Sequence, residues 1–272
     1  MGVSLARASL ERPTAEARLE SGSASMARTF FPSAARILAA EGKKVLAIDA
    51  DPDSNLASAV GLSKEALAGL APIASQTSLI EERTGAKKGS FGSMFKLNPR
   101  VDDLPDTMGV LYEGVKLILL GCIPQGGGGC FCPENVILKN LIRHLVVQRE
   151  EAVIIDMEAG LEHLGRGSTG SVDALIVVVE PGQRSINTAR QIKKLGEDLH
   201  LKKMMIVGNK VTSDEDRRMI EENLRDFPVL GYMSFNPKVI QADREGRSPY
   251  DIDETIREEV RGILRELEKR IQ

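Results

Sequence analysis

Short apolar runs separated by helical patterns constrain the fold of this chain most strongly. Strands buried on both faces read as near-continuous apolar runs, and helices alternate with them in parallel sheets. The apolar runs lie at residues 44–49, 116–121, 152–156, 174–179, 204–208 and 229–231. Helical patterns lie at residues 34–41, 63–69, 134–148, 185–199, 214–225 and 253–271. The order predicts an α/β fold, a mostly parallel sheet with helices on both faces.

Acidic residues follow two of these predicted strands. The first run leads into Asp49-Ala50-Asp51, and a later one leads into Asp156-Met157-Glu158-Ala159-Gly160. Ligands of parallel sheets bind at the carboxyl ends of the strands, and an Asp in this position is typical of the carboxylates that act on Mg²⁺ in phosphate-handling enzymes. Each Asp could instead cap the following helix. Two such strand ends together favour Mg-nucleotide chemistry.

Two closely spaced cysteines follow a run of four glycines at residues 126–129. In an extended segment Cys130 and Cys132 point to the same side, and Pro133 suits the first position of a helix whose dipole favours the thiolate form of Cys132. Two thiolates form half of a tetrahedral soft-metal site, and a two-fold homodimer would supply the other half. The alternative is a glycine loop with two ordinary cysteines.

Composition excludes several classes of function. A net charge of −3 disfavours a general nucleic-acid surface, and 4% aromatic residues disfavour stacking platforms for single strands. No run reaches the roughly 18 apolar residues of a membrane span. Three cysteines, two of them in one CxC, argue against a disulfide framework and for a reducing, cytoplasmic location.

Three motifs together resemble those of the carbon monoxide dehydrogenase accessory (nickel-insertion) ATPases, which belong to the MinD/ParA-like class of P-loop ATPases. The motifs are Asp-Ala-Asp-Pro-Asp-Ser-Asn at residues 49–55, Gly-Cys-Phe-Cys-Pro-Glu-Asn at 129–135, and Asp-Met-Glu-Ala-Gly-Leu-Glu-His-Leu-Gly-Arg-Gly at 156–167. The resemblance extends from about residue 33 to the C-terminus. The acidic motifs indicate the broad class, and the CxC followed by Pro-Glu-Asn is the more specific signal.

The resemblance implies roles for individual residues. Asp51 would orient the attacking water or support Mg²⁺, and Asp156 would be the Walker B carboxylate. Glu158 and Gly160 would sense the γ-phosphate. The other residues implied to bind ATP/Mg²⁺ are Asp49, Asn209 and Lys210. Asn209 would hydrogen-bond to adenine; the alternative is that it caps a helix. Cys130 and Cys132 would hold Ni²⁺ or Zn²⁺ between the protomers of a homodimer that serves carbon monoxide dehydrogenase.

The sequence departs from this family ahead of the first helix. The family has Lys-Gly-Gly-x-Gly-Lys-Thr-Thr there, whereas residues 22–29 read Gly-Ser-Ala-Ser-Met-Ala-Arg-Thr, with Ala27 in the position of the phosphate lysine. Without these N–H groups and this lysine the phosphates lose their anion site, so we expect weak ATP binding and poor hydrolysis. A frameshifted or misassigned N-terminus would explain the change.

The apolar first strand of the family is absent as well. We therefore expect an atypical, disordered or non-native-like segment over residues 1–30 and a single P-loop-type α/β domain over 31–272. The first strand of the sheet would be disrupted and its neighbours left unpaired.

Three other functions compete with a metal-inserting ATPase. A non-enzymatic pseudo-ATPase would keep the dimer and the thiols as a metal-binding scaffold. A partition or septum-positioning ATPase would need a membrane-targeting helix or a basic face. An iron–sulfur carrier of the same superfamily would present CxxC and a coloured cluster.

Overall fold

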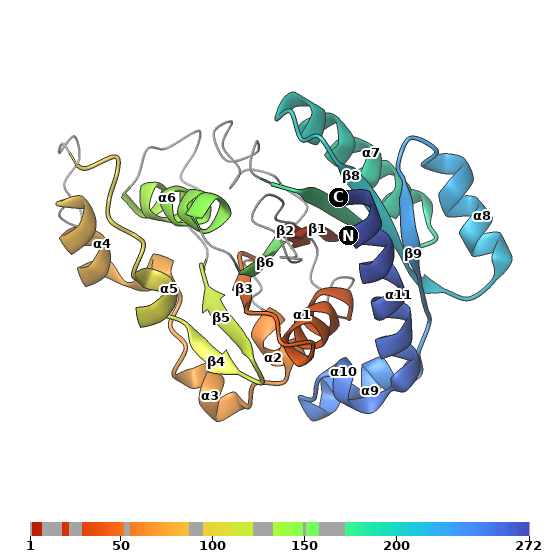
Figure 1. Ribbon diagram of the computed structural model, residues 1–272, viewed down its shortest axis with the longest axis horizontal. Helices are drawn as coiled ribbons and strands as arrows, with labels where there is room; N and C mark the ends of the chain where they lie inside the picture. Colours follow the sequence, from red (N-terminus) through yellow and green to blue (C-terminus); the bar gives the residue numbers. More distant parts are fainter. Residues whose placement is uncertain are drawn as a thin grey trace.

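The protein folds around one nine-stranded sheet with the strand order β4-β5-β3-β6-β2-β1-β7-β8-β9 (Figure 1). The computed structural model describes residues 2–6, 18–21, 29–51, 55–86, 95–121, 133–148, 151–157 and 172–271. The strands are β1 (Gly2–Ala6), β2 (Arg18–Ser21), β3 (Val45–Asp49), β4 (Val110–Tyr112), β5 (Val115–Leu119), β6 (Ala152–Met157), β7 (Ala174–Val179), β8 (Met204–Val211) and β9 (Val229–Ser234).

The predicted parallel sheet is confirmed. Strands β5, β3 and β6 pair in parallel, and so do β7, β8 and β9. Because β1 is antiparallel to both β6 and β7, these two strands also run in the same direction. Short β4 is antiparallel to β5 and forms one edge of the sheet.

The centre of the sheet differs from our expectation of unpaired neighbours, which is wrong. The backbone of β1 pairs along β7 from Gly2 to Ala6, and β2 pairs along β6 from Arg18 to Ser21. Unpaired N–H and C=O groups on two buried strands are costly, so short extended segments are stabilised between them. The sequence did not reveal these strands because neither is a long apolar run. The division of the chain at residue 30 stays a prediction.

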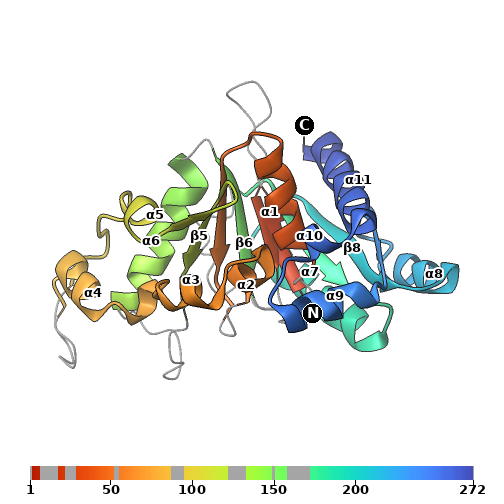
Figure 2. The same ribbon diagram turned by 90° about the horizontal axis from the view of Figure 1, so that it is seen from below.

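Helices cover both faces of the sheet (Figure 2). Side chains of α6 and α7 pack on one face, and those of α1, α2 and α11 pack on the other. The helices are α1 (Phe30–Ala40), α2 (Leu56–Val60), α3 (Lys64–Ala68), α4 (Thr77–Thr84), α5 (Leu104–Thr107), α6 (Pro133–Gln148), α7 (Gln183–Asp198), α8 (Asp214–Asn223), α9 (Pro237–Glu245), α10 (Pro249–Ile252) and α11 (Glu254–Ile271), with a 3₁₀ turn at Ile73–Ser75.

The apolar residues of the C-terminal helix α11 pack against the sheet along one face of the helix. Ile256, Val260, Ile263, Leu264 and Leu267 recur at helical spacing and are all buried against the sheet. Each fully buried side chain of this size contributes about 1.5–3 kcal/mol. Within the described ranges no helix is long and apolar enough to cross a membrane.

Candidate nucleotide site at the carboxyl ends of the strands

The structure brings three predicted carboxylates together. Asp49 ends β3 and Asp156 lies near the end of the adjacent β6, and the two residues are direct partners in the parallel register. The Ala50 N–H donates to the Asp156 carbonyl oxygen at 2.8 Å, which fixes the start of the chain segment that carries Asp51. Asp49, Asp51 and Asp156 are 1%, 7% and 8% exposed.

This carboxylate cluster is electrostatically strained. Burial raises the pKa of Asp156 well above its ordinary value, and the nearby Asp49 and Asp51 raise it further. A divalent cation with oxygen ligands would relieve this repulsion, so the residue types fit Mg²⁺. Among the residues that the structure describes, however, no three His, Cys, Asp or Glu side chains are arranged as a complete metal site.

Asp49 has a structural task in this cluster. One carboxylate oxygen accepts from the Asp51 N–H at 3.2 Å, and the other accepts from the Leu56 N–H at 3.0 Å. Leu56 is the first residue of α2, so Asp49 satisfies a backbone donor at a helix start. This contact matches the capping alternative for Asp49, while its role in cofactor binding stays a prediction.

We predict that Asp156→Asn stabilises the fold by about 1 kcal/mol at pH 7.5 in the presence of a chelator. A carboxyl whose pKa is raised on folding contributes stability that is present below its unfolded pKa and is lost as the pH rises through the folded pKa. The advantage of the neutral amide should therefore grow between pH 4.5 and 7.5, measured by urea unfolding. Asp216→Asn is the control, because hydrogen bonds from Thr212 lower the pKa of Asp216. A destabilised Asp156→Asn variant would contradict the repulsion argument.

The segment Asn209-Lys210 forms an irregularity in β8. Its register against β9 shifts between Gly208 and Val211, and Lys210 has a φ of 54°. Such bulges re-aim side chains and are over-represented beside active sites. Asn209 is 5% exposed. It does not cap α8, because Ser213 is the cap and accepts from the Asp216 N–H at 3.2 Å.

Glu180 joins this segment and was missed in the sequence. The Lys210 Nζ lies 2.6 Å from a Glu180 carboxylate oxygen. Glu180 directly follows the apolar strand β7, the same position that identified Asp49 and Asp156, so the strand-end rule applied to every run would have found it. The contacts of Asn209 and Lys210 with adenine stay predictions.

The start of α1 does not fit the phosphates of a nucleotide. Its first turn carries Phe30 and Phe31, both fully buried, with ring centroids 4.7 Å apart in an edge-to-face arrangement. Pro32 follows and has no N–H to donate. A helix start binds anions through exposed N–H groups, and this one is packed with apolar side chains instead. Among the described residues, carboxylates that suit Mg²⁺ therefore lie together, whereas the first turn of α1 does not suit the phosphates.

Four predicted site residues lie outside the described part of the chain. They are Cys130, Cys132, Glu158 and Gly160. Their roles stay predictions.

Comparisons with known proteins agree with this geometry. Residues 33–250 match the CobQ/CobB/MinD/ParA nucleotide binding domain. The chain is 44% identical over 237 residues to the carbon monoxide dehydrogenase accessory protein CooC of Rhodospirillum rubrum, covering 87% of this chain and 90% of that protein. It is 38% identical over 247 residues to an uncharacterized ATP-binding protein of Methanocaldococcus jannaschii, covering 89% and 94% of the two chains.

Solved structures support the fold. The MinD cell division protein of Aquifex aeolicus superposes with a TM-score of 0.62 at 17% identity, covering 91% of this chain and 94% of that one. A ParA family ATPase of Chlorobium tepidum superposes with a TM-score of 0.58 at 16% identity, covering 89% and 93%. At this level of identity the likeness concerns the arrangement of helices and strands.

Proposed function

Because the chain belongs to the CobQ/CobB/MinD/ParA nucleotide-binding family, we propose that it is a maturation factor that helps to insert nickel into carbon monoxide dehydrogenase. The observation that carries this proposal is the 44% identity with a carbon monoxide dehydrogenase accessory protein over most of both chains. Metal would be held by Cys130 and Cys132 at the interface of a homodimer, since two thiolates per protomer complete a four-ligand soft-metal site.

The nucleotide-driven part of this function is proposed to be impaired. Asp51 and Asp156 retain the carboxylates that would act on water and Mg²⁺. The glycine–lysine loop is absent from the sequence, and the first turn of α1 carries the buried Phe30, Phe31 and Pro32 after it. When bound, MgATP would supply the energy of phosphoryl transfer, but these residues supply too few phosphate contacts to hold it tightly.

A second candidate is a non-enzymatic metal-binding pseudo-ATPase. The packed start of α1 favours it, because Phe30 and Phe31 belong to the core and not to a ligand site. Such a protein would hold and deliver metal without a nucleotide cycle. ATP affinity and ATP-dependence separate the two candidates.

Reconstitution with nickel-free carbon monoxide dehydrogenase tests the function. At limiting Ni²⁺ we expect the chain to accelerate nickel incorporation at least about threefold over free Ni²⁺, with less than a twofold further gain from MgATP, because the phosphate site is incomplete. Nickel content of the re-isolated enzyme is the measurement. A large stimulation by MgATP would restore the ATPase reading. No acceleration with or without MgATP would refute the proposed function.

A further inference from the structure

The exposed Leu97 is held against α6, although the two lie far apart in the sequence. Leu97 is 56% exposed, and its carbonyl oxygen accepts from the Asn140 side-chain amide at 2.9 Å. The same amide donates to the Val136 carbonyl at 2.8 Å, and the neighbouring Lys96 N–H donates to the Thr84 carbonyl at 2.8 Å. Leu97 is therefore held in place by α4 and α6 while its side chain faces solvent.

Three exposed cations lie on the two segments that the Leu97–Asn140 hydrogen bond joins. Lys139 and Arg143 are exposed on α6, next to Asn140 and one turn beyond it, and Lys96 is exposed beside Leu97. No hydrogen bond or ion pair joins these three side chains to the described residues. We call Lys96, Leu97, Lys139 and Arg143 the Leu97 face. Its positive charge contrasts with the net charge of −3 of the whole chain.

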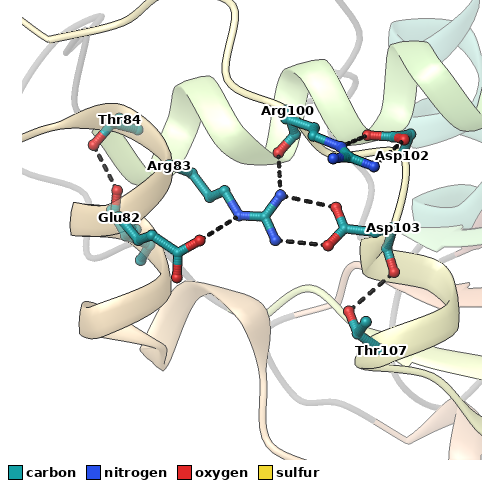
Figure 3. A network of polar contacts seen from close by, with 8 residues as sticks. Glu82, Arg83, Thr84, Arg100, Asp102, Asp103 and Thr107 are labelled. Atoms are coloured by element: carbon teal, nitrogen blue, oxygen red, sulfur yellow. Dashed lines mark hydrogen bonds and ion pairs between the residues drawn. The ribbon is translucent and has the colours of Figure 1, made fainter.

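A hollow of about 420 Å³ adjoins the Leu97 face and is lined in part by Glu82, Lys96, Asn98 and Pro99. Figure 3 shows the network that holds its wall, in which Arg83 of α4 makes two hydrogen bonds of 2.8 and 2.6 Å to Asp103. The Arg83 guanidinium also donates to the Arg100 carbonyl at 3.2 Å. Bidentate pairs of this kind fix geometry as well as charge.

Ion pairs join the charged groups of this wall to one another. Asp103 neutralises Arg83, and Asp102 lies 2.7 Å from the Arg100 guanidinium. Glu82 also lines the hollow and lies 3.4 Å from the Arg83 guanidinium, so the excess positive charge of this surface comes from Lys96, Lys139 and Arg143 and not from the wall. A ligand that fits this surface needs negative charge for these cations and an apolar group for Leu97.

From this combination we propose that the Leu97 face docks an acidic segment of a partner protein, with an apolar side chain of that segment against Leu97. Exposed cations steer and orient an acidic partner, and an apolar contact with the exposed Leu97 slows its release. The identity of the partner rests on the proposed function: the partner would be the enzyme that accepts the metal. Figure 1 shows α4, α5 and α6 together at one end of the molecule.

Binding of the full chain to nickel-free carbon monoxide dehydrogenase tests this docking surface. Leu97→Ser combined with Lys139→Glu and Arg143→Glu should weaken binding at least about tenfold at 50 mM NaCl and reduce its salt dependence. Leu195→Ser combined with Arg184→Glu and Lys194→Glu is the matched control, since it makes the same change of charge at residues that are exposed on α7 over the other half of the sheet. The control should bind as the unmodified chain does. Equal binding by both variants would overturn the docking surface and leave the proposed function standing.

A milder variant and a competition experiment distinguish an apolar docking contact from a purely electrostatic one. The milder Leu97→Ala variant, with unchanged thermal stability, should lose about threefold in affinity, because truncating one apolar contact removes part of the hot spot. A DNA oligonucleotide, as a polyanion without an apolar side chain, should compete only weakly with the enzyme for the chain, and the Leu97 variants should not change this competition. If the oligonucleotide binds the chain as tightly as the enzyme does, the face is a nucleic-acid surface and the proposal is overturned. If the unmodified chain does not bind the enzyme at any salt concentration, the docking proposal is wrong. The metal content of the unmodified chain then tests the proposed metal binding by Cys130 and Cys132 separately.

Discussion

Replacing Cys130 and Cys132 by alanine is expected to abolish stoichiometric nickel or zinc binding. The unmodified chain should hold one metal ion per two protomers, because four thiolates complete a tetrahedral set only when two copies meet. The double variant removes all four ligands at once. Metal content after gel filtration, measured by elemental analysis, should fall from about half an ion per chain to background.

Single variants and pH sharpen this prediction. Cys130→Ala leaves one thiolate per protomer, so the affinity should fall by at least about 10²-fold while weak binding remains. Cys122→Ala is the matched control for the loss of a thiol and should keep the full stoichiometry. Metal affinity should also fall as the pH is lowered, because the thiols must lose their protons to bind. Unchanged metal content in the double variant would remove the metal site from the proposed function.

The regular part of the fold was predictable because its signals are local. The apolar runs at β3, β6 and β7 are buried along their whole length, and the stripe of α11 is buried where its period places it. The short elements were not predictable in this way. Edge strand β4 and helix α5 are only three and four residues long. Strand β4 is held by its pairing with β5, and the start of α5 is held by the Arg83–Asp103 pair.

The positions of the candidate site residues that follow predicted strands could be predicted from the sequence. Asp49 and Asp156 follow apolar runs, and the parallel register places them side by side. What each carboxylate contacts depends on the neighbouring backbone, so the bonds from Asp49 to two N–H groups could not be read from the sequence. The Lys210–Glu180 pair likewise depends on a bulge in β8, which no local pattern indicates.

Grafting the family's phosphate loop onto this chain is expected to raise ATP hydrolysis by at least about 10³-fold. The graft replaces residues 1–28 by an apolar strand followed by Lys-Gly-Gly-Val-Gly-Lys-Thr, which then leads into Thr29. Its backbone N–H groups would cradle the phosphates, and its second lysine would neutralise charge that develops in the transition state. Removing a single donor of this kind from an enzyme typically costs about 10²–10³ in rate, so restoring several should exceed that factor. Phosphate release under saturating MgATP is the measurement.

Two comparisons decide whether the loop alone limits the reaction. Ala27→Lys in the unmodified chain should gain little, because a lysine without the glycine loop has no N–H groups beside it and α1 still begins with the packed Phe30 and Phe31. The graft with Asp156→Asn should stay inactive, since the carboxylate acting on Mg²⁺ is then missing. If the unmodified chain already hydrolyses ATP at a rate typical of its class, the absent loop does not impair it, and phosphate contacts from elsewhere in the chain must be sought. If the graft folds but stays inactive, the fully buried first turn of α1 becomes the limiting feature, and smaller side chains at Phe30 and Phe31 are the next variants to combine with it.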